Sequence, residues 1–263
     1  YFPMIHTRQE VLAEIEAKPK LKQEFYSWEK KYRKEFLDFC TGVKGVKIMY
    51  DFISKEILNP ETVPERVEEL LSLLIGQQVH IKEVLPNDGT RISDESTLVI
   101  MDMVVELEDG SIVNLEVQKI GYKFPGARSA CYSADLLLRQ YKKVRSKKGK
   151  KFNYTDVKDV YTIVLFEKSP TEFHEFPDTY IHYFEQHSNT GIQLNLLQKY
   201  LFISIDIFLK YQQNIGIQLE TRRDAWLAFM GSDDPDIILK VIDEQQQAVG
   251  DVHAADAAVE VQR

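Results

Sequence analysis

Two runs in which apolar and polar residues alternate, Met101–Leu107 and Ile112–Gln118, form the clearest pattern in the chain. They meet at Glu108-Asp109-Gly110, a sequence typical of a hairpin loop whose glycine takes a left-handed conformation because it has no Cβ. Side chains on a strand alternate between the two faces of the sheet. The pattern therefore predicts a hairpin with one apolar face and one more polar face, in a register that places Asp102 opposite Glu116.

The more polar face of this hairpin carries both carboxylates, with Glu106 nearer the turn. Like charges directly opposite one another destabilise a strand pair. A hard divalent cation would cancel the repulsion, because such ions prefer oxygen ligands. The alternative is a solvent-facing hairpin whose outer face is simply polar. The helix expected after the hairpin favours the metal interpretation, since it must pack on one face of the sheet.

The rest of the central region predicts an α/β core around the hairpin. Helices are expected where apolar residues recur at helical spacing, at Val46–Leu58, Pro64–Leu74 and Pro125–Val144. Strands are expected in short apolar runs, at Val79–Leu85, Val157–Phe166, Tyr180–Glu185, Gly191–Leu197 and Tyr200–Phe208. The order helix, three strands, helix, strand is typical of a mixed sheet with helices on both sides.

Helical segments flank this core at both ends. Thr7-Arg-Gln-Glu10 is a capping-box pattern that begins a helix ending near Lys18-Pro19. A second helix carries an aromatic stripe from Leu21 to Phe39, which indicates packing more than binding, and it ends at Gly42. Near the C-terminus we expect helices at Asp224–Phe229 and Pro235–Glu244, followed by a tail with too little apolar periodicity to place.

The hairpin and the helix after it resemble the core of the PD-(D/E)XK nucleases: an Asp near the start of one strand, then Glu-x-Gln at the end of its partner. The longer strings Leu98–Asp102 and Glu116–Arg128, continued by Ala130–Tyr141 and Val160–Phe166, are similar to the transposase branch of that superfamily, the recombination-promoting nuclease type. The resemblance covers roughly residues 46 to 230. Gln118 stands where many members have Lys, and Gln is an accepted variant in this branch.

This resemblance implies a fold and an activity. The fold would be an α/β, restriction-endonuclease-like core with a mixed central sheet flanked by helices. Residues 1–45 would form a helical N-terminal appendage, 46–230 the nuclease-like domain, and 231–263 a C-terminal helix with an acidic, disordered tail. The activity would be that of a Mg²⁺- or Mn²⁺-dependent endonuclease of transposase or recombination type, which hydrolyses phosphodiester bonds in double-stranded DNA with a metal-activated water.

The resemblance also implies a role for each residue of the motif. Asp102 and Glu116 would hold the metal, with the backbone carbonyl of Val117 as a third oxygen. Gln118 would orient the water or the phosphate through its amide, because it cannot supply the positive charge of a Lys. Arg128, in the helix that follows, would contact the scissile phosphate.

That helix carries a polar stripe at intervals of four, three and four residues: Arg128, Tyr132, Asp135 and Arg139. Such a stripe usually faces solvent, and Tyr132 could equally support Arg128. Asp135 and Arg139 could simply pair with each other, being four residues apart. An upstream helical acid, Glu65 or Glu69, could assist the metal, although a surface position is the simpler interpretation for either.

The distribution of charge is more informative than the net charge of −8. The segment from Tyr122 to Lys151 contains ten Lys or Arg residues and a single acid, Asp135, whereas eight acids follow Gly231. A local basic zone in an acidic chain is typical of a phosphate-binding footprint, and a solvated Lys-rich loop is the alternative. We assign to flanking contacts with the DNA backbone the basic residues of this loop, Arg145, Lys147, Lys148, Lys150 and Lys151.

Several other functional classes find no support in the sequence. Cys40 and Cys131 lie far apart without a CxxC pair, which favours buried thiols in a reducing cytoplasm. No apolar run approaches the roughly 20 residues that span a bilayer, and the histidines lack zinc-ligand spacing. Two alternatives to the enzyme stay open: an inactive nuclease fold that binds DNA or a protein, and an interaction protein whose hairpin is purely structural. A homodimer is left open.

Overall fold

The computed structural model describes residues 6–44, 49, 54–55, 57–86, 102–119, 126–234, 236–238 and 241. The chain divides into two compact units. One comprises Met49–Leu227, and the other comprises Tyr1–Ile48 together with Ala228–Arg263. The larger unit falls within residues 46–230, the range expected for the nuclease-like domain, and the exact domain boundaries stay a prediction.

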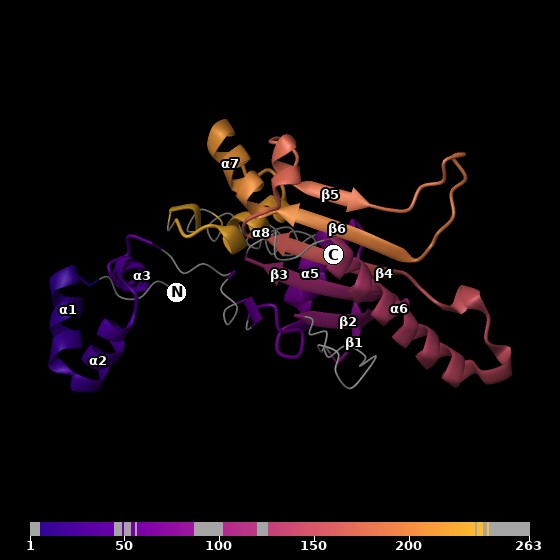
Figure 1. Cartoon of the computed structure of the whole chain (residues 1–263), viewed down its shortest axis with the longest axis horizontal. Coiled ribbons are helices and arrows are strands. Elements are labelled where there is room, and N and C mark those ends of the chain that lie inside the picture. The colour runs from indigo at the N-terminus through magenta and orange to yellow at the C-terminus, as the bar shows by residue number, and fades with distance from the viewer. Residues whose placement is uncertain are drawn as a thin grey trace, which may run out of the picture. The chain divides into compact units, whose positions relative to one another are not determined.

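The larger unit is built on one six-stranded sheet with the order β1-β2-β3-β4-β6-β5 (Figure 1). Its strands are β1 (Ile81–Val84), β2 (Met103–Leu107), β3 (Ile112–Gln118), β4 (Val160–Phe166), β5 (Ile181–Phe184) and β6 (Gln198–Ser204). The β3–β4 and β4–β6 pairs are parallel, and the other three pairs are antiparallel. The mixed sheet expected from the sequence is therefore confirmed.

The β2–β3 hairpin has the predicted register. Met103 pairs with Leu115, and the Leu107 backbone N–H donates to the Ser111 carbonyl at 2.8 Å. Gly110 closes the turn with φ +90°, and a Cβ added there would lie 3.3 Å from Cγ of Lys158. The left-handed backbone conformation favours glycine at this position, and a larger residue would also have to displace the Lys158 side chain by a few tenths of an ångström.

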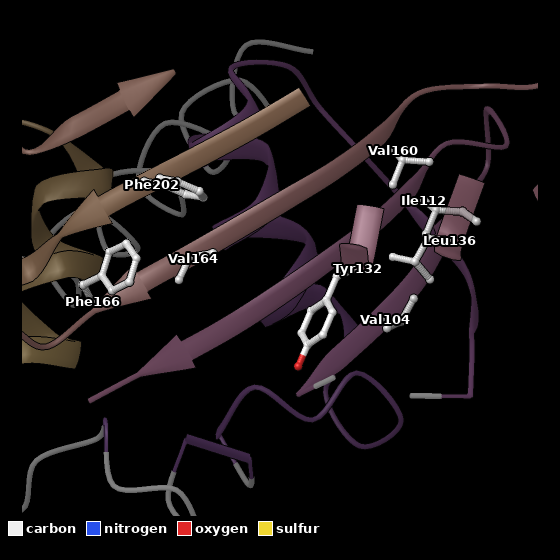
Figure 2. Close-up of a cluster of buried hydrophobic side chains, with 8 residues drawn as sticks. All are labelled: Val104, Ile112, Tyr132, Leu136, Val160, Val164, Phe166 and Phe202. Atoms are coloured by element: carbon white, nitrogen blue, oxygen red, sulfur yellow. The ribbon is translucent and has the colours of Figure 1, made fainter. Parts of the chain in front are cut away.

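One face of the sheet is covered by α6 (Gly126–Lys148). Tyr132 and Leu136 of α6 point onto this face (Figure 2). There they pack against apolar side chains from four strands: Val104, Ile112, Val160, Val164, Phe166 and Phe202. Residues paired across β3, β4 and β6 share a face, so the same side of the sheet that carries Glu116 forms this core.

The opposite face of the sheet is buried as well. The inward side chains of the central strands, among them Val113, Ile163 and Ile203, have no exposed surface. Helix α5 (Pro64–Ile75) is seen behind the strands, on the side away from α6 (Figure 1). Both faces of the hairpin are therefore covered, and the interpretation of a polar face open to solvent is wrong. Any charged group on these strands must find its partner inside the protein or at the strand ends.

The N-terminal unit contains α1 (Arg8–Ala17), α2 (Pro19–Ser27) and α3 (Lys30–Cys40). The capping box of α1 is confirmed, since Glu10 N–H donates to Thr7 Oγ1 and Thr7 N–H donates to the Glu10 carboxylate. The single second helix expected from the aromatic stripe is wrong. Trp28 is extended and separates α2 from α3, and its ring packs 5.6 Å from that of Phe36. Leu21, Phe25, Trp28 and Phe36 fold back into an internal core, which confirms a packing role for them, whereas Tyr32 is exposed.

The strand expected over Tyr200–Phe208 ends early. β6 stops at Ser204, and the next residues begin α7 (Ile205–Ile215), which packs on β4. The segment Gly191–Leu197 forms no strand. Helix α8 (Arg222–Gly231) is confirmed with longer bounds than expected, whereas most of Val46–Leu58 and Pro235–Glu244 lies outside the described residues.

Two smaller expectations were also tested. Both cysteines are free thiols, but only Cys40 is partly buried, and burial raises its pKa. Cys131 is exposed on α6, so the expectation of two buried thiols is wrong for this residue. Among the helices in the described part of the chain, none is both long and apolar enough to cross a membrane.

Candidate functional site

Asp102 and Glu116 lie together at the open end of the hairpin, away from the turn. Asp102 immediately precedes β2, and continuing the register of the hairpin by one pair places it opposite Glu116. The Asp102 backbone N–H donates to Glu116 Oε1 at 3.3 Å, and the Val117 N–H donates to Asp102 Oδ2 at 2.8 Å. The Glu116 carboxylate is thus held by the backbone of Asp102, and the Asp102 carboxylate by the backbone of Val117, the residue after Glu116. The juxtaposition expected from the sequence is present.

The Glu116 side chain is almost fully removed from solvent, with only 4% of the residue exposed. Burial raises the pKa of Glu116 to about 8, and the nearby charge of Asp102 adds to the rise. Asn114, the Asp102 backbone and Arg128 lower this pKa, but by less. Two ionised carboxylates are therefore unfavourable here unless a positive charge joins them.

The raised pKa of Glu116 predicts how stability depends on pH in the metal-free protein. Above pH 4.5 the unfolded chain ionises Glu116, whereas the folded protein keeps the proton until pH is about 8. The free energy of unfolding should therefore fall across this window by up to about 5 kcal/mol. Denaturant unfolding in EDTA near both pH limits checks this. Glu116→Gln cannot ionise, so its fall should be smaller by that amount, and equal falls in both proteins would contradict the assignment.

Arg128 and Tyr132 form a pair on the first turns of α6. Arg128 Nε donates to Tyr132 Oη at 2.7 Å, and the guanidinium carbon lies 5.1 Å from the centre of the Tyr132 ring. Burial raises the pKa of Tyr132, Arg128 lowers it, and the charges of Glu116 and Asp102 raise it further. The tyrosine therefore lies within electrostatic reach of both acids, and it is 3% exposed. A solvent-facing position for Tyr132 is wrong.

The remaining members of the helical stripe have a structural role. Asp135 and Arg139 form an ion pair at 2.7 Å, as their spacing allows, and Arg139 also donates to the carbonyl of Pro86.

Gln118 is half-buried at the end of β3, on the same face as Glu116. Its carbonyl accepts from the Glu167 N–H at 2.9 Å, which fixes the strand end beside the two acids.

A cavity of about 590 Å³ adjoins Asp102. Its lining includes Asp102, Val117, Lys55 and Glu61. Neither of the upstream acids proposed from the sequence lines this cavity. Glu69 pairs with Arg222, and both Glu65 and Glu69 border a separate hollow near His80. Glu61, which does line the cavity, lies in a Pro-flanked turn, and no periodic pattern in the sequence marks it.

A comparison with protein families identifies the family of the chain. The model of the PD-(D/E)XK nuclease family transposases matches residues 48–255. The chain belongs to this family. The matched residues include all six strands and helices α5 to α8, and they begin after α3. The mixed sheet flanked by helices is the restriction-endonuclease-like fold of the family. No match was found among curated proteins or among solved structures.

PD-(D/E)XK nucleases generally use divalent metal ions, and the acids of this family member suit one. Asp102 and Glu116 lie at the same strand end, and Glu116 is buried and has a raised pKa beside the charge of Asp102. No group of three or more His, Cys, Asp or Glu side chains suited to a metal occurs among the described residues. Two carboxylates, a backbone carbonyl and water form the oxygen-rich, part-hydrated shell that Mg²⁺ accepts.

The basic segment at the end of α6 is not the loop expected from the sequence. Ser146 to Lys148 form the last turn of α6, and Gly149–Lys151 is a 3-10 turn. The five basic residues assigned to DNA are exposed, although Lys148 pairs with Asp156. Because α6 is continuous, Lys148 lies roughly 30 Å along the helix from Arg128, and the two cannot contact the same phosphate.

Proposed function

We propose that the chain is a metal-dependent DNA endonuclease of transposase or recombination type that hydrolyses phosphodiester bonds. One observation carries the proposal: Asp102 and Glu116 interlock at a strand end, and the resulting burial and repulsion keep the pKa of Glu116 near 8. A hairpin with a purely structural role would gain no stability from two opposed carboxylates, because like charges destabilise a strand pair. A divalent cation would relieve both the repulsion and the raised pKa.

The surrounding residues have separate tasks in this proposal. Asp102, Glu116 and the Val117 carbonyl would hold Mg²⁺ or Mn²⁺. When bound, the ion supplies an activated water and offsets charge on the phosphate. The Gln118 amide would orient the water or a phosphate oxygen. Arg128 would neutralise the phosphate that is attacked, and it keeps its direction because its Nε is tied to Tyr132.

Duplex DNA is the proposed substrate, and α6 defines part of its path. The basic residues at the C-terminal end of the helix are too far from the acids for catalysis. They would contact flanking backbone phosphates, which give affinity without reading sequence. A binding module without activity remains the second candidate, since Gln118 replaces the Lys found in many members of the superfamily.

Metal removal tests the proposal directly. The purified protein should nick or linearise plasmid DNA in Mg²⁺ or Mn²⁺, should stop in EDTA, and should recover when the metal is restored in excess. The products are resolved on agarose gels against time. Equal cleavage in EDTA would contradict metal dependence. DNA binding without cleavage in either metal would favour the binding module instead.

A further inference from the structure

Three aromatic rings gather at the far end of α6. Tyr141, in the helix, stacks on Tyr154 with ring centres 6.0 Å apart and planes within 12° of each other. Phe152 meets both rings edge-on, at 5.5 Å and 5.3 Å. We call these three residues the aromatic tip. Figure 1 shows the end of α6 and the residues after it running beyond the edge of the sheet.

Within this tip, Tyr154 is the ring that faces solvent. The residue is 73% exposed, whereas Tyr141 and Phe152 are partly buried. The ring stacks on Tyr141, and most of the surface of Tyr154 is nevertheless accessible. The backbone around it is fixed by a capping box, in which Asn153 N–H donates to Asp156 at 2.9 Å and Thr155 N–H donates to Asn153 at 3.1 Å. The protein thus holds a large aromatic face in water in a defined orientation.

The surroundings of the aromatic tip are strongly basic. Residues 142–151 contain seven Lys or Arg and no acid. Arg145 lies over Tyr141, with its guanidinium 5.6 Å from the ring centre. Lys147, Lys150 and Lys151 are exposed in the segment that joins Tyr141 to Phe152. Positive charge beside an open aromatic face is the combination that binds single-stranded nucleic acid, because bases stack on the ring and phosphates meet the charges.

Contacts with a duplex would not use such a ring. In double-stranded DNA the bases already stack on one another, and the protein meets mainly phosphates and groove edges. Lysines alone would therefore suffice for duplex binding. The exposed Tyr154 face gains a partner only where a base is unpaired.

We propose that the aromatic tip binds single-stranded DNA, with an unpaired base stacked on Tyr154 and its neighbouring phosphates on Lys147, Lys150 and Lys151. The inference deepens the proposed function, because it relies on DNA as the substrate and adds that the DNA includes an unpaired segment. It does not rely on cleavage. Tyr141 of the aromatic tip lies roughly 20 Å along α6 from Arg128, so binding there and chemistry at the acids can be measured separately.

Fluorescence anisotropy of the full chain in EDTA tests this with two labelled probes, a short oligothymidine and a duplex of equal length. Tyr154→Ala should weaken binding of the oligothymidine by between about 5-fold and about 100-fold, the range expected for loss of one stacked base. Duplex affinity should stay unchanged. Tyr154→Trp should keep the single-strand affinity, because indole also stacks. Tyr183→Ala, which removes an exposed ring of β5, is the matched control and should change neither affinity.

A variant with Lys147, Lys150 and Lys151 replaced by Gln completes the test. It should weaken both probes and flatten their salt dependence, since each phosphate contact releases counterions. The proposal is overturned if the unaltered chain does not bind oligothymidine, or if Tyr154→Ala binds it as the unaltered chain does. It is also overturned if Tyr154→Ala weakens both probes equally, because the ring would then only support the lysines. Failure of cleavage would count against the proposed function and leave these results standing.

Discussion

Replacing Glu116 with glutamine is expected to abolish DNA cleavage in Mg²⁺ while the protein stays folded. Gln has the same shape but cannot offer the charged oxygen that a divalent ion prefers. Metal stabilisation of a reacting phosphate is worth several kcal/mol, so its loss should lower the rate by about three orders of magnitude or more. Asp102→Asn should have the same effect, because its carboxylate lies directly beside Glu116 and accepts from the Val117 N–H.

A matched control for these variants lies on the same hairpin. Glu106 is also buried and shares a face with Glu116, but it lies near the turn and is held by Lys82 and Lys143. Glu106→Gln should therefore keep most of its cleavage activity. Plasmid nicking and circular dichroism on all the variants provide the measurement. A folded Glu116→Gln protein with full activity would refute the metal site. Equal losses in Glu106→Gln would mean that any buried charge in the hairpin matters only for folding.

The second largest effect is expected at Gln118. Gln118→Ala should slow cleavage by roughly 10-fold to 100-fold, the value of one hydrogen bond to a charged group. Metal affinity should change little, because the two acids and the Val117 carbonyl remain. Single-turnover rates at saturating Mg²⁺, together with calorimetric titration of the metal, separate the two effects.

Gln118→Lys distinguishes orientation from charge at the same position. An ammonium group can donate to the water or phosphate and can also offset negative charge, so this variant should cleave at least as fast as the unaltered protein. If Gln118→Ala keeps the full rate, Gln118 serves only to hold the end of β3 through its backbone contact with Glu167. A slower Gln118→Lys protein would show that the site is built around a neutral amide.

The parts of the fold that could be predicted are those specified by neighbouring residues. The Glu-Asp-Gly turn and the alternation on either side of it specify the register, and the register alone places Asp102 opposite Glu116. The capping box at Thr7 is equally local. In contrast, the run after Ser204 is apolar enough for a strand and becomes α7, because short apolar runs suit a buried strand and a buried helix equally well.

The parts that could not be predicted depend on distant packing. Nothing near Trp28 breaks a helix in the way Pro or Gly would, and the break there follows from its ring packing against Phe25 and Phe36. The burial of Tyr132 likewise follows from the side of α6 that meets the sheet, and a stripe of polar residues conceals it. Glu61 and Asp102 border the same cavity although they are distant in sequence, and no local pattern indicates this.

The continuity of α6 fixes the distance between the residues at its two ends. A 23-residue helix without a break joins the arginine beside the acids to the basic end, and roughly 30 Å of helix corresponds to about nine base pairs of duplex. If the proposed duplex runs along α6, DNA would be protected asymmetrically, for about nine base pairs to one side of the acids. Deleting one residue between the two ends would shorten the reach by only about 1.5 Å, but it would turn the basic end by about 100° around the helix axis.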